Sequence, residues 1–115
     1  ERNAGLDGMP EKRPYDRTTT GMGTFEEKGV AKQQNHHPTV KPLSLTKYLA
    51  TLIKPPTGGR LLVPFSGSGS EMIGALQAGW EYVEGVELTE EYIPIAEARI
   101  KHWLDKMSKE QMELL

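Results

Sequence analysis

One stretch of the sequence fits a ligand-binding loop: the glycine-rich Pro64-Phe65-Ser66-Gly67-Ser68-Gly69. It follows the short apolar run 61–63 and precedes a segment with helical spacing of apolar residues, so we expect it to connect a strand to a helix. Glycines let such a loop turn sharply and let its backbone approach a ligand. The first turn of the helix then offers unpaired N–H groups to a polar or anionic ligand group.

A carboxylate stands where a nucleotide-binding fold would use one. Glu87 follows the next expected strand, residues 82–86, where a carboxylate accepts hydrogen bonds from both hydroxyls of a ribose. The glycine loop alone is weaker evidence, because Met72 occupies the position of the third glycine in the dinucleotide-binding fingerprint. The same residues also fit a tight turn that binds no ligand, with Glu87 as a solvated carboxylate.

A second polar segment, His37-Pro38-Thr39-Val40-Lys41-Pro42, precedes the first expected helix. Its two prolines restrict the chain to an extended path that ends where the helix starts. This restriction holds the Thr39 hydroxyl and the Lys41 ammonium in fixed directions, as donors for a ligand carboxylate. The alternative is an ordinary helix start with an exposed lysine.

Hydrophobic periodicity predicts the elements that must position these residues. After Pro42 we expect a helix whose buried face consists of Leu45, Tyr48, Leu49, Leu52 and Ile53. A strand over 61–63, a helix closed by Gly79 and a strand over 82–86 follow. The last expected helix runs from about 90 to 104, with an apolar face of Tyr92, Ile95, Ala96, Ile100 and Trp103.

Helices that alternate with strands predict an α/β fold with parallel strands and crossover helices. Two strands are too few for a stable sheet of this kind, so we expect the rest of the sheet to come from other sequence or another chain. Residues 1–36 are polar and broken by glycines and prolines, which predicts an irregular, mobile arm or loop. Residues 37–104 are the ordered part, and residues 105–115 a helical extension or tail.

The charge balance bears on the partners of the protein. Fourteen Lys and Arg residues stand against sixteen Asp and Glu residues, for a formal net charge of −2. A domain that binds DNA by itself usually has a basic surplus, because phosphate contacts dominate its affinity. The sequence has no cysteine, hence no disulfide framework and no thiolate metal site, and no apolar run of membrane-spanning length. We expect a cytoplasmic protein with no membrane partner and no metal.

Taken in order, these motifs resemble the C-terminal half of the β-type DNA amino-methyltransferases of bacteria and phages, which modify adenine-N6 or cytosine-N4. The resemblance rests on His-Pro-Thr-x-Lys-Pro, the helix after it, Pro-Phe-Ser-Gly-Ser-Gly, and Gly85-Val86-Glu87 followed by Glu90-Glu91-Tyr92. It covers residues 36 to about 104. It implies part of a doubly wound, Rossmann-like sheet that binds S-adenosylmethionine for methyl transfer to DNA, in a restriction-modification or prophage setting.

The resemblance implies a role for each motif. Thr39 and Lys41, together with His37, would hold the carboxylate of S-adenosylmethionine. Glu87 would accept the ribose hydroxyls, and Leu88 would lie near the adenine. The methionine and ribose portions would be wrapped by the loop residues Phe65, Ser66, Gly67, Ser68 and Gly69.

Two departures from the family matter. Val63 stands where the family usually has an acidic residue, which removes one polar contact near the cofactor. The catalytic motif, Asp/Asn/Ser-Pro-Pro-aromatic, is absent, so we expect no catalytic residue here and no methyl transfer by this chain alone. The acceptor site and most of the DNA contact would lie in an N-terminal half that precedes these motifs.

Other interpretations stay open. An RNA or protein methyltransferase would have the same cofactor pocket. A non-catalytic or split methyltransferase-like subunit would bind the cofactor without acting on a substrate, and a fragment with an incomplete sheet could form a homo-oligomer. A nicotinamide dehydrogenase fragment has the least support, because the third glycine of its fingerprint is missing.

Overall fold

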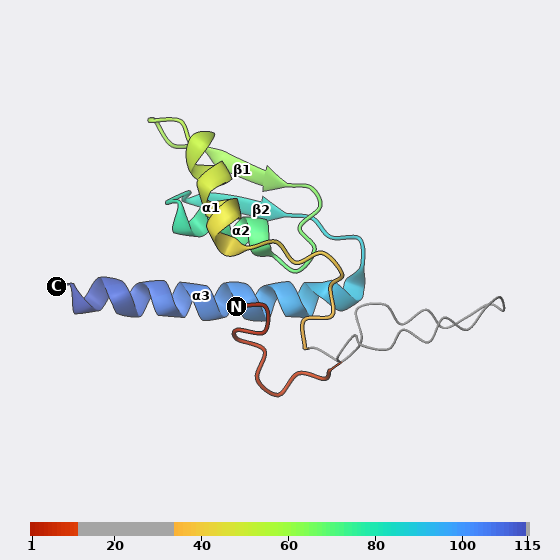
Figure 1. Ribbon diagram of the computed structural model, residues 1–115. Coiled ribbons are helices and arrows are strands. Elements are labelled where there is room, and N and C mark those ends of the chain that lie inside the picture. The colour runs from red at the N-terminus through yellow and green to blue at the C-terminus, as the bar shows by residue number, and fades with distance from the viewer. Residues whose placement is uncertain (12–33, 115) are drawn as a thin grey trace.

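The computed structural model describes residues 1–11 and 34–114. Its elements follow one another as α1 (Leu43–Leu52), β1 (Arg60–Val63), α2 (Ser70–Gln77), β2 (Tyr82–Gly85), the 3₁₀ turn η1 (Glu90–Tyr92) and α3 (Ile93–Glu113). Figure 1 shows α3 running along one side of the unit formed by α1, α2 and the strands, and continuing beyond it at the C-terminal end.

The two strands pair in parallel, from Arg60 opposite Tyr82 to Val63 opposite Gly85. A parallel pair needs a crossover connection, and α2 provides it. This helix contacts both strands as well as α1 and α3, so it lies at the centre of the described structure (Figure 1). The predicted mixed α/β class with parallel strands is confirmed. The complete doubly wound sheet stays a prediction, since the described residues contribute two strands.

The predicted strands agree with the observed ones to within one residue at each end. The last helix differs more, because α3 continues to Glu113 rather than ending near residue 104. The sequence between these positions contains no glycine or proline that would stop a helix. Among residues 1–11 and 34–114, none of the helices combines the length and the apolar composition that a membrane span requires.

The small core lies where α1, α2 and the loop before β2 meet. Ala50, Ala75 and Trp80 are buried together, and the Trp80 indole donates a hydrogen bond to the carbonyl of Ala50 at 2.9 Å. The two helices approach closely at Gly74, where a Cβ atom would collide with Thr46 of α1. A glycine in the middle of a helix is unfavourable by itself. The close approach of α1 and α2 explains why a glycine occupies this position.

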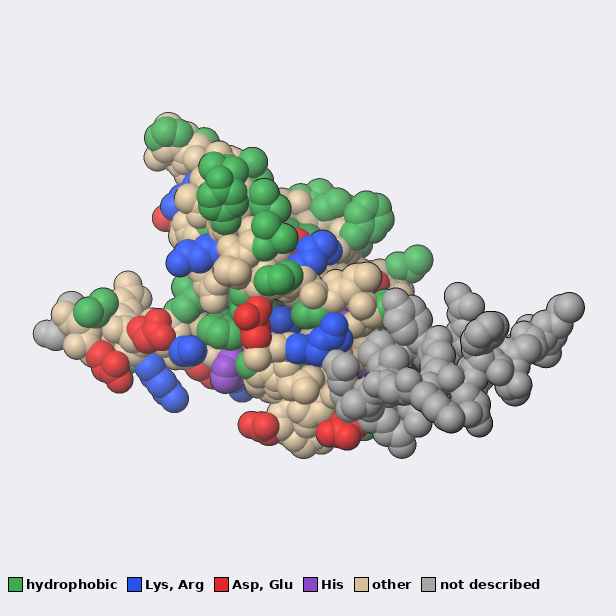
Figure 2. Space-filling view, in the orientation of Figure 1, with side chains coloured by type: hydrophobic (Ala, Val, Ile, Leu, Met, Phe, Trp, Pro, Cys, Tyr) green, Lys and Arg blue, Asp and Glu red, His purple; other side chains and the backbone are tan. Residues whose placement is uncertain are grey.

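The prediction for the buried face of α1 is wrong. The residues of α1 that are buried are Leu43, Thr46 and Ala50. Thr46 donates a hydrogen bond to the carbonyl of Ser70 in α2, and Ala50 packs in the core with Ala75 of α2. The large apolar residues expected to be buried are 47% to 64% exposed: Leu45, Tyr48, Leu49, Leu52 and Ile53. Small residues allow α1 to approach α2 closely, so the bulky stripe lies on the other side. Figure 2 shows hydrophobic side chains gathered over α1 on the viewed face.

The described part of the N-terminal arm is irregular, as expected, but it is not loose. Leu6 and Asn35 are fully buried. The carboxylate of Glu1 accepts a hydrogen bond from the N–H of Leu43 at 2.7 Å, at the start of α1. Gly5 packs so closely on α3 that a Cβ atom there would collide with His102. Residues 12–33 of the arm lie outside the described residues, so the predicted mobility of residues 1–36 stays a prediction.

Candidate functional site

The predicted ligand residues gather at the carboxyl ends of the two strands. A cavity of about 360 Å³ lies there, a volume within the usual range of small-molecule sites. Of the predicted residues it is lined by His37, Thr39, Lys41, Phe65, Ser66, Gly67, Ser68 and Glu87. The sequence motifs, separated by up to 50 positions, thus meet at one place because parallel strands end at the same edge of a sheet.

The glycine loop makes one wall of this cavity. Gly67 has φ +53° and Gly69 has φ +85°, both in the left-handed region that favours glycine. A Cβ atom on Gly67 would also lie 2.7 Å from Nε2 of His37, so this position lacks space as well. The N–H of Gly69 donates to the carbonyl of Ser66 at 2.8 Å, which closes the turn.

Glu87 is tied to the glycine loop by its side chain. One carboxylate oxygen accepts a hydrogen bond from the N–H of Gly67 at 2.7 Å, and the other accepts one from the N–H of Thr89 at 2.8 Å. The Thr89 bond is the main reason why the pKa of Glu87 is lowered, and the Gly67 bond adds to it. Each oxygen keeps further acceptor capacity, so this ionised carboxylate can accept bonds from two hydroxyls of a ligand.

His37 lines the cavity beside Gly67. Its Nδ1 accepts a hydrogen bond from the N–H of Thr39 at 3.1 Å, which leaves the proton of the neutral imidazole on Nε2. The ring lies 4.5 Å from the ring of Tyr92, centroid to centroid. Partial burial lowers the pKa of His37, Lys41 adds to this effect, and Glu87 opposes it. The histidine is therefore a neutral donor above its lowered pKa.

Lys41 forms an ion pair with Glu71, which stands in the first turn of α2. A carboxylate is favourable there, because it lies near the positive end of the helix dipole. A ligand carboxylate that binds Lys41 would share or replace this pair. Glu71 was not predicted from the sequence as part of the site.

Two predicted residues lie outside the lining. Gly69 is the N-cap of α2 and packs on α3, where a Cβ atom would lie 3.3 Å from the Cβ of Ala96. Leu88 is 96% exposed beside the cavity. Val63, the residue that departs from the family pattern, is buried and is absent from the lining.

Other lining residues were not predicted. Ser70 and Thr89 follow the two motifs directly, so their proximity in the chain was the available signal. Tyr92 was assigned to the apolar face of the last helix, but it ends the 3₁₀ turn η1 and lies against His37. Within residues 1–11 and 34–114, no group of three His, Asp or Glu side chains is placed to hold a metal ion.

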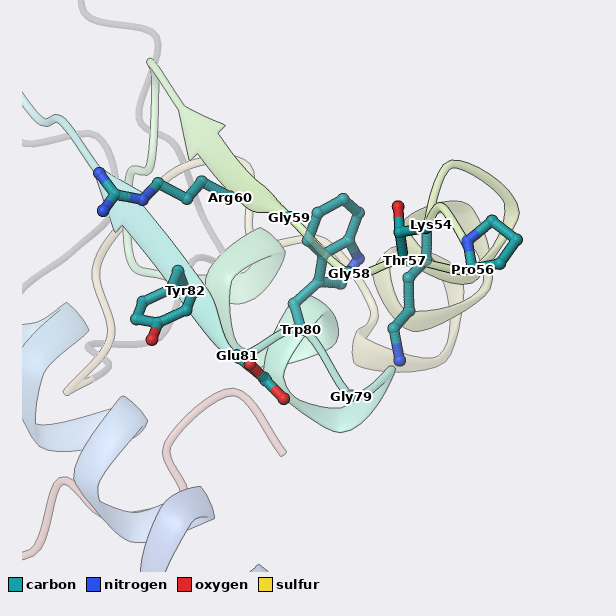
Figure 3. Close-up of a pocket in the computed structure, with 10 residues that line it drawn as sticks. All are labelled: Lys54, Pro56, Thr57, Gly58, Gly59, Arg60, Gly79, Trp80, Glu81 and Tyr82. Atoms are coloured by element: carbon teal, nitrogen blue, oxygen red, sulfur yellow. The ribbon is translucent and has the colours of Figure 1, made fainter.

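A second cavity, of about 490 Å³, lies at the amino ends of the strands (Figure 3). Its walls come from Lys54, from residues 56–60 at the start of β1 and from residues 79–82. It contains no residue of the predicted motifs. Ligands of open α/β sheets bind outside the carboxyl ends of the strands, so the smaller cavity is the better candidate despite its size.

Fold and cavity define a mixed α/β protein with a cavity at the carboxyl ends of two parallel strands. No protein-family model matches the chain, and no solved structure matches it. The chain is 40% identical over 65 residues to a protein of Escherichia coli (strain K12) described as "Putative methylase YubD". The match covers 56% of this chain and 28% of that protein, so the chain spans little more than a quarter of this relative. The similarity supports a methyltransferase relationship.

Proposed function

We propose that this chain is the cofactor-binding part of an S-adenosylmethionine-dependent DNA methyltransferase that modifies the exocyclic amino group of adenine or cytosine. The observation that carries the proposal is the meeting of His37, Thr39, Lys41, the glycine loop and Glu87 around one cavity. The relationship to a methylase supports the same reaction class.

The donors and acceptors of the cavity fit the two ends of this cofactor. Thr39 and Lys41 would bind the carboxylate, with His37 Nε2–H as a further donor. Glu87 would accept the ribose hydroxyls, held in place by its bonds from Gly67 and Thr89. Phe65 is 86% exposed and Leu88 96% exposed, which suits apolar cover for the adenine ring.

When bound, the cofactor supplies an activated methyl group, and the task of these residues is to bind and orient it. Acceptors for the amino group of a flipped base would come from the Pro-Pro-aromatic motif that the sequence does not contain. The chain has a net charge of −2 and so lacks the basic surplus that phosphate contacts need, and most of the DNA contact would therefore come from residues outside it. Activity and DNA specificity are therefore proposed for a larger protein.

Isothermal titration calorimetry with S-adenosylhomocysteine, the stable product, tests the cofactor assignment. We expect Lys41→Ala and Thr39→Ala to weaken binding about tenfold, since bonds to a charged ligand group contribute roughly 1.5–3 kcal/mol. Lys54→Ala is the matched control, because this lysine lines the second cavity. Equal effects of Lys41→Ala and Lys54→Ala, or no binding by the unsubstituted protein, would contradict the proposal.

A split or non-catalytic binding subunit is the second candidate. The observation in its favour is the large apolar face of α1, which needs cover from another polypeptide or from a second copy of the chain. A tritiated-methyl transfer assay on mixed-sequence DNA separates the two candidates. A methyltransferase is active as the complete protein and inactive as this chain alone, whereas a binding subunit is inactive in both forms.

A further inference from the structure

Arg99 is a buried cation that the proposed chemistry does not use. It lies on α3 with its side chain fully buried, behind the glycine loop and outside the lining of the cavity. No carboxylate in the described residues forms a salt bridge with it. Burying a guanidinium without a salt bridge is unfavourable, and an apolar side chain of similar volume would often stabilise the fold more. Its position therefore calls for another reason than stability.

All the hydrogen bonds of Arg99 in the described structure go to one short segment. Its Nη1 donates to the carbonyl of Ser68 at 2.7 Å, to the hydroxyl of Ser68 at 2.9 Å and to the hydroxyl of Ser70 at 3.1 Å. Both serines line the cavity from the other side. The cation thus lies directly beneath the floor of the candidate cofactor site.

Ser68 is the residue that most needs such a contact. It stands between Gly67 and Gly69, both at positive φ, and glycine has more backbone freedom than any other residue. The Ser68 side chain is itself buried, and its hydroxyl also accepts a hydrogen bond from the buried amide of Asn35 at 3.3 Å. Ser68 is therefore held by both Arg99 and Asn35, between two glycines.

The loop is consequently held by two charged side chains on opposite sides. Glu87 binds the N–H of Gly67 from the cavity side, and Arg99 binds the carbonyl of Ser68 from the core side. We propose that Arg99 is a positioning residue that holds the glycine loop in its cofactor-binding shape before the cofactor arrives. The inference rests on the proposed cofactor function, but the loop contact itself can be tested without any ligand.

The position of Arg99 in the sequence indicated burial but did not identify its partner. Arg99 falls on the predicted apolar face of the last helix, four residues after Ile95 and four before Trp103. An arginine at such a position either extends to solvent along its aliphatic stem or finds buried acceptors. Arg99 finds buried acceptors because α3 packs behind the glycine loop.

The first test is hydrogen exchange of the Gly67 and Gly69 amides in the cofactor-free protein, read by NMR. Arg99→Met keeps an unbranched buried side chain and removes the donors, so we expect exchange of these two amides to accelerate at least tenfold more than that of the strand amides. Trp80→Phe is the matched control, because it breaks a buried hydrogen bond at the other end of the strands. A uniform change across the protein in Arg99→Met, like that in Trp80→Phe, would overturn the proposal.

The second test is the affinity for S-adenosylhomocysteine. Arg99→Met should weaken binding about tenfold, and Arg99→Lys should restore part of it, because an ammonium still donates to the Ser68 carbonyl. If Arg99→Met does not fold, Ser68→Ala removes one acceptor of Arg99, and its effect on the exchange of the Gly67 and Gly69 amides is measured instead. Unchanged affinity in a folded variant overturns the role of Arg99. If the unsubstituted protein does not bind, the proposed function fails, and the exchange rates alone decide whether Arg99 holds the loop.

Discussion

Replacing Gly67 by alanine should have two effects: strain in the backbone and a change in the shape of the candidate site. Gly67 has φ +53°, and a non-glycine residue in this region costs roughly 1–2 kcal/mol. The new Cβ atom would also lie 2.7 Å from Nε2 of His37, about 0.8 Å closer than an ordinary van der Waals contact of ~3.5 Å. The histidine ring must move, so the shape of the cavity changes. We expect Gly67→Ala to lower the free energy of unfolding by about 1–2 kcal/mol and to weaken cofactor binding.

Gly58→Ala is the matched control for this substitution. Gly58 has φ +75°, and nothing lies within 4 Å of its Cβ position, so the substitution adds strain without a collision. Urea unfolding should show similar losses of stability for both variants, while calorimetry should show weakened binding of S-adenosylhomocysteine for Gly67→Ala alone. Equal binding by the two variants would refute the view that Gly67 and His37 form the wall of the site.

Three further predictions follow from the same geometry. Folding lowers the pKa of Glu87, so the stability that Glu87 contributes is present above the ordinary pKa of 4.5 and disappears as the pH falls through the lowered pKa. Glu87→Gln should therefore flatten the decline of Tm in acid. An unchanged decline would argue against the Gly67 and Thr89 bonds. Folding also lowers the pKa of His37, so stability should rise with pH between that lowered value and 6.5, and an NMR titration should give a midpoint below 6.5 rather than above it. Leu49 is 51% exposed, so Leu49→Gln should change the free energy of unfolding by less than about 0.5 kcal/mol and reduce self-association in sedimentation experiments. Ala50 is buried, so Ala50→Gln should unfold the chain. A strongly destabilised Leu49→Gln monomer would contradict the observed orientation of α1.

Much of the candidate site could be predicted from the sequence, because its chemistry is local. The two prolines around Thr39 and Lys41 set an extended path, and the glycines at positions 67 and 69 adopt backbone angles that few other residues tolerate. Parallel strands then bring the loop and Glu87 to one edge of the sheet. Neither the loop nor the acid needed long-range information to be identified.

The tertiary structure decided what each face packs against. Periodicity correctly identified a bulky apolar stripe on α1, but the buried side consists of the smaller Thr46 and Ala50, because Gly74 lets the helices approach there. The hydroxyl of Ser68 turns back to Arg99 and Asn35 rather than remaining free for a ligand. These outcomes depend on contacts between residues that lie far apart in the sequence. A pattern within one helix or loop shows that a side chain must be covered or paired, but the partner is chosen only when the elements pack.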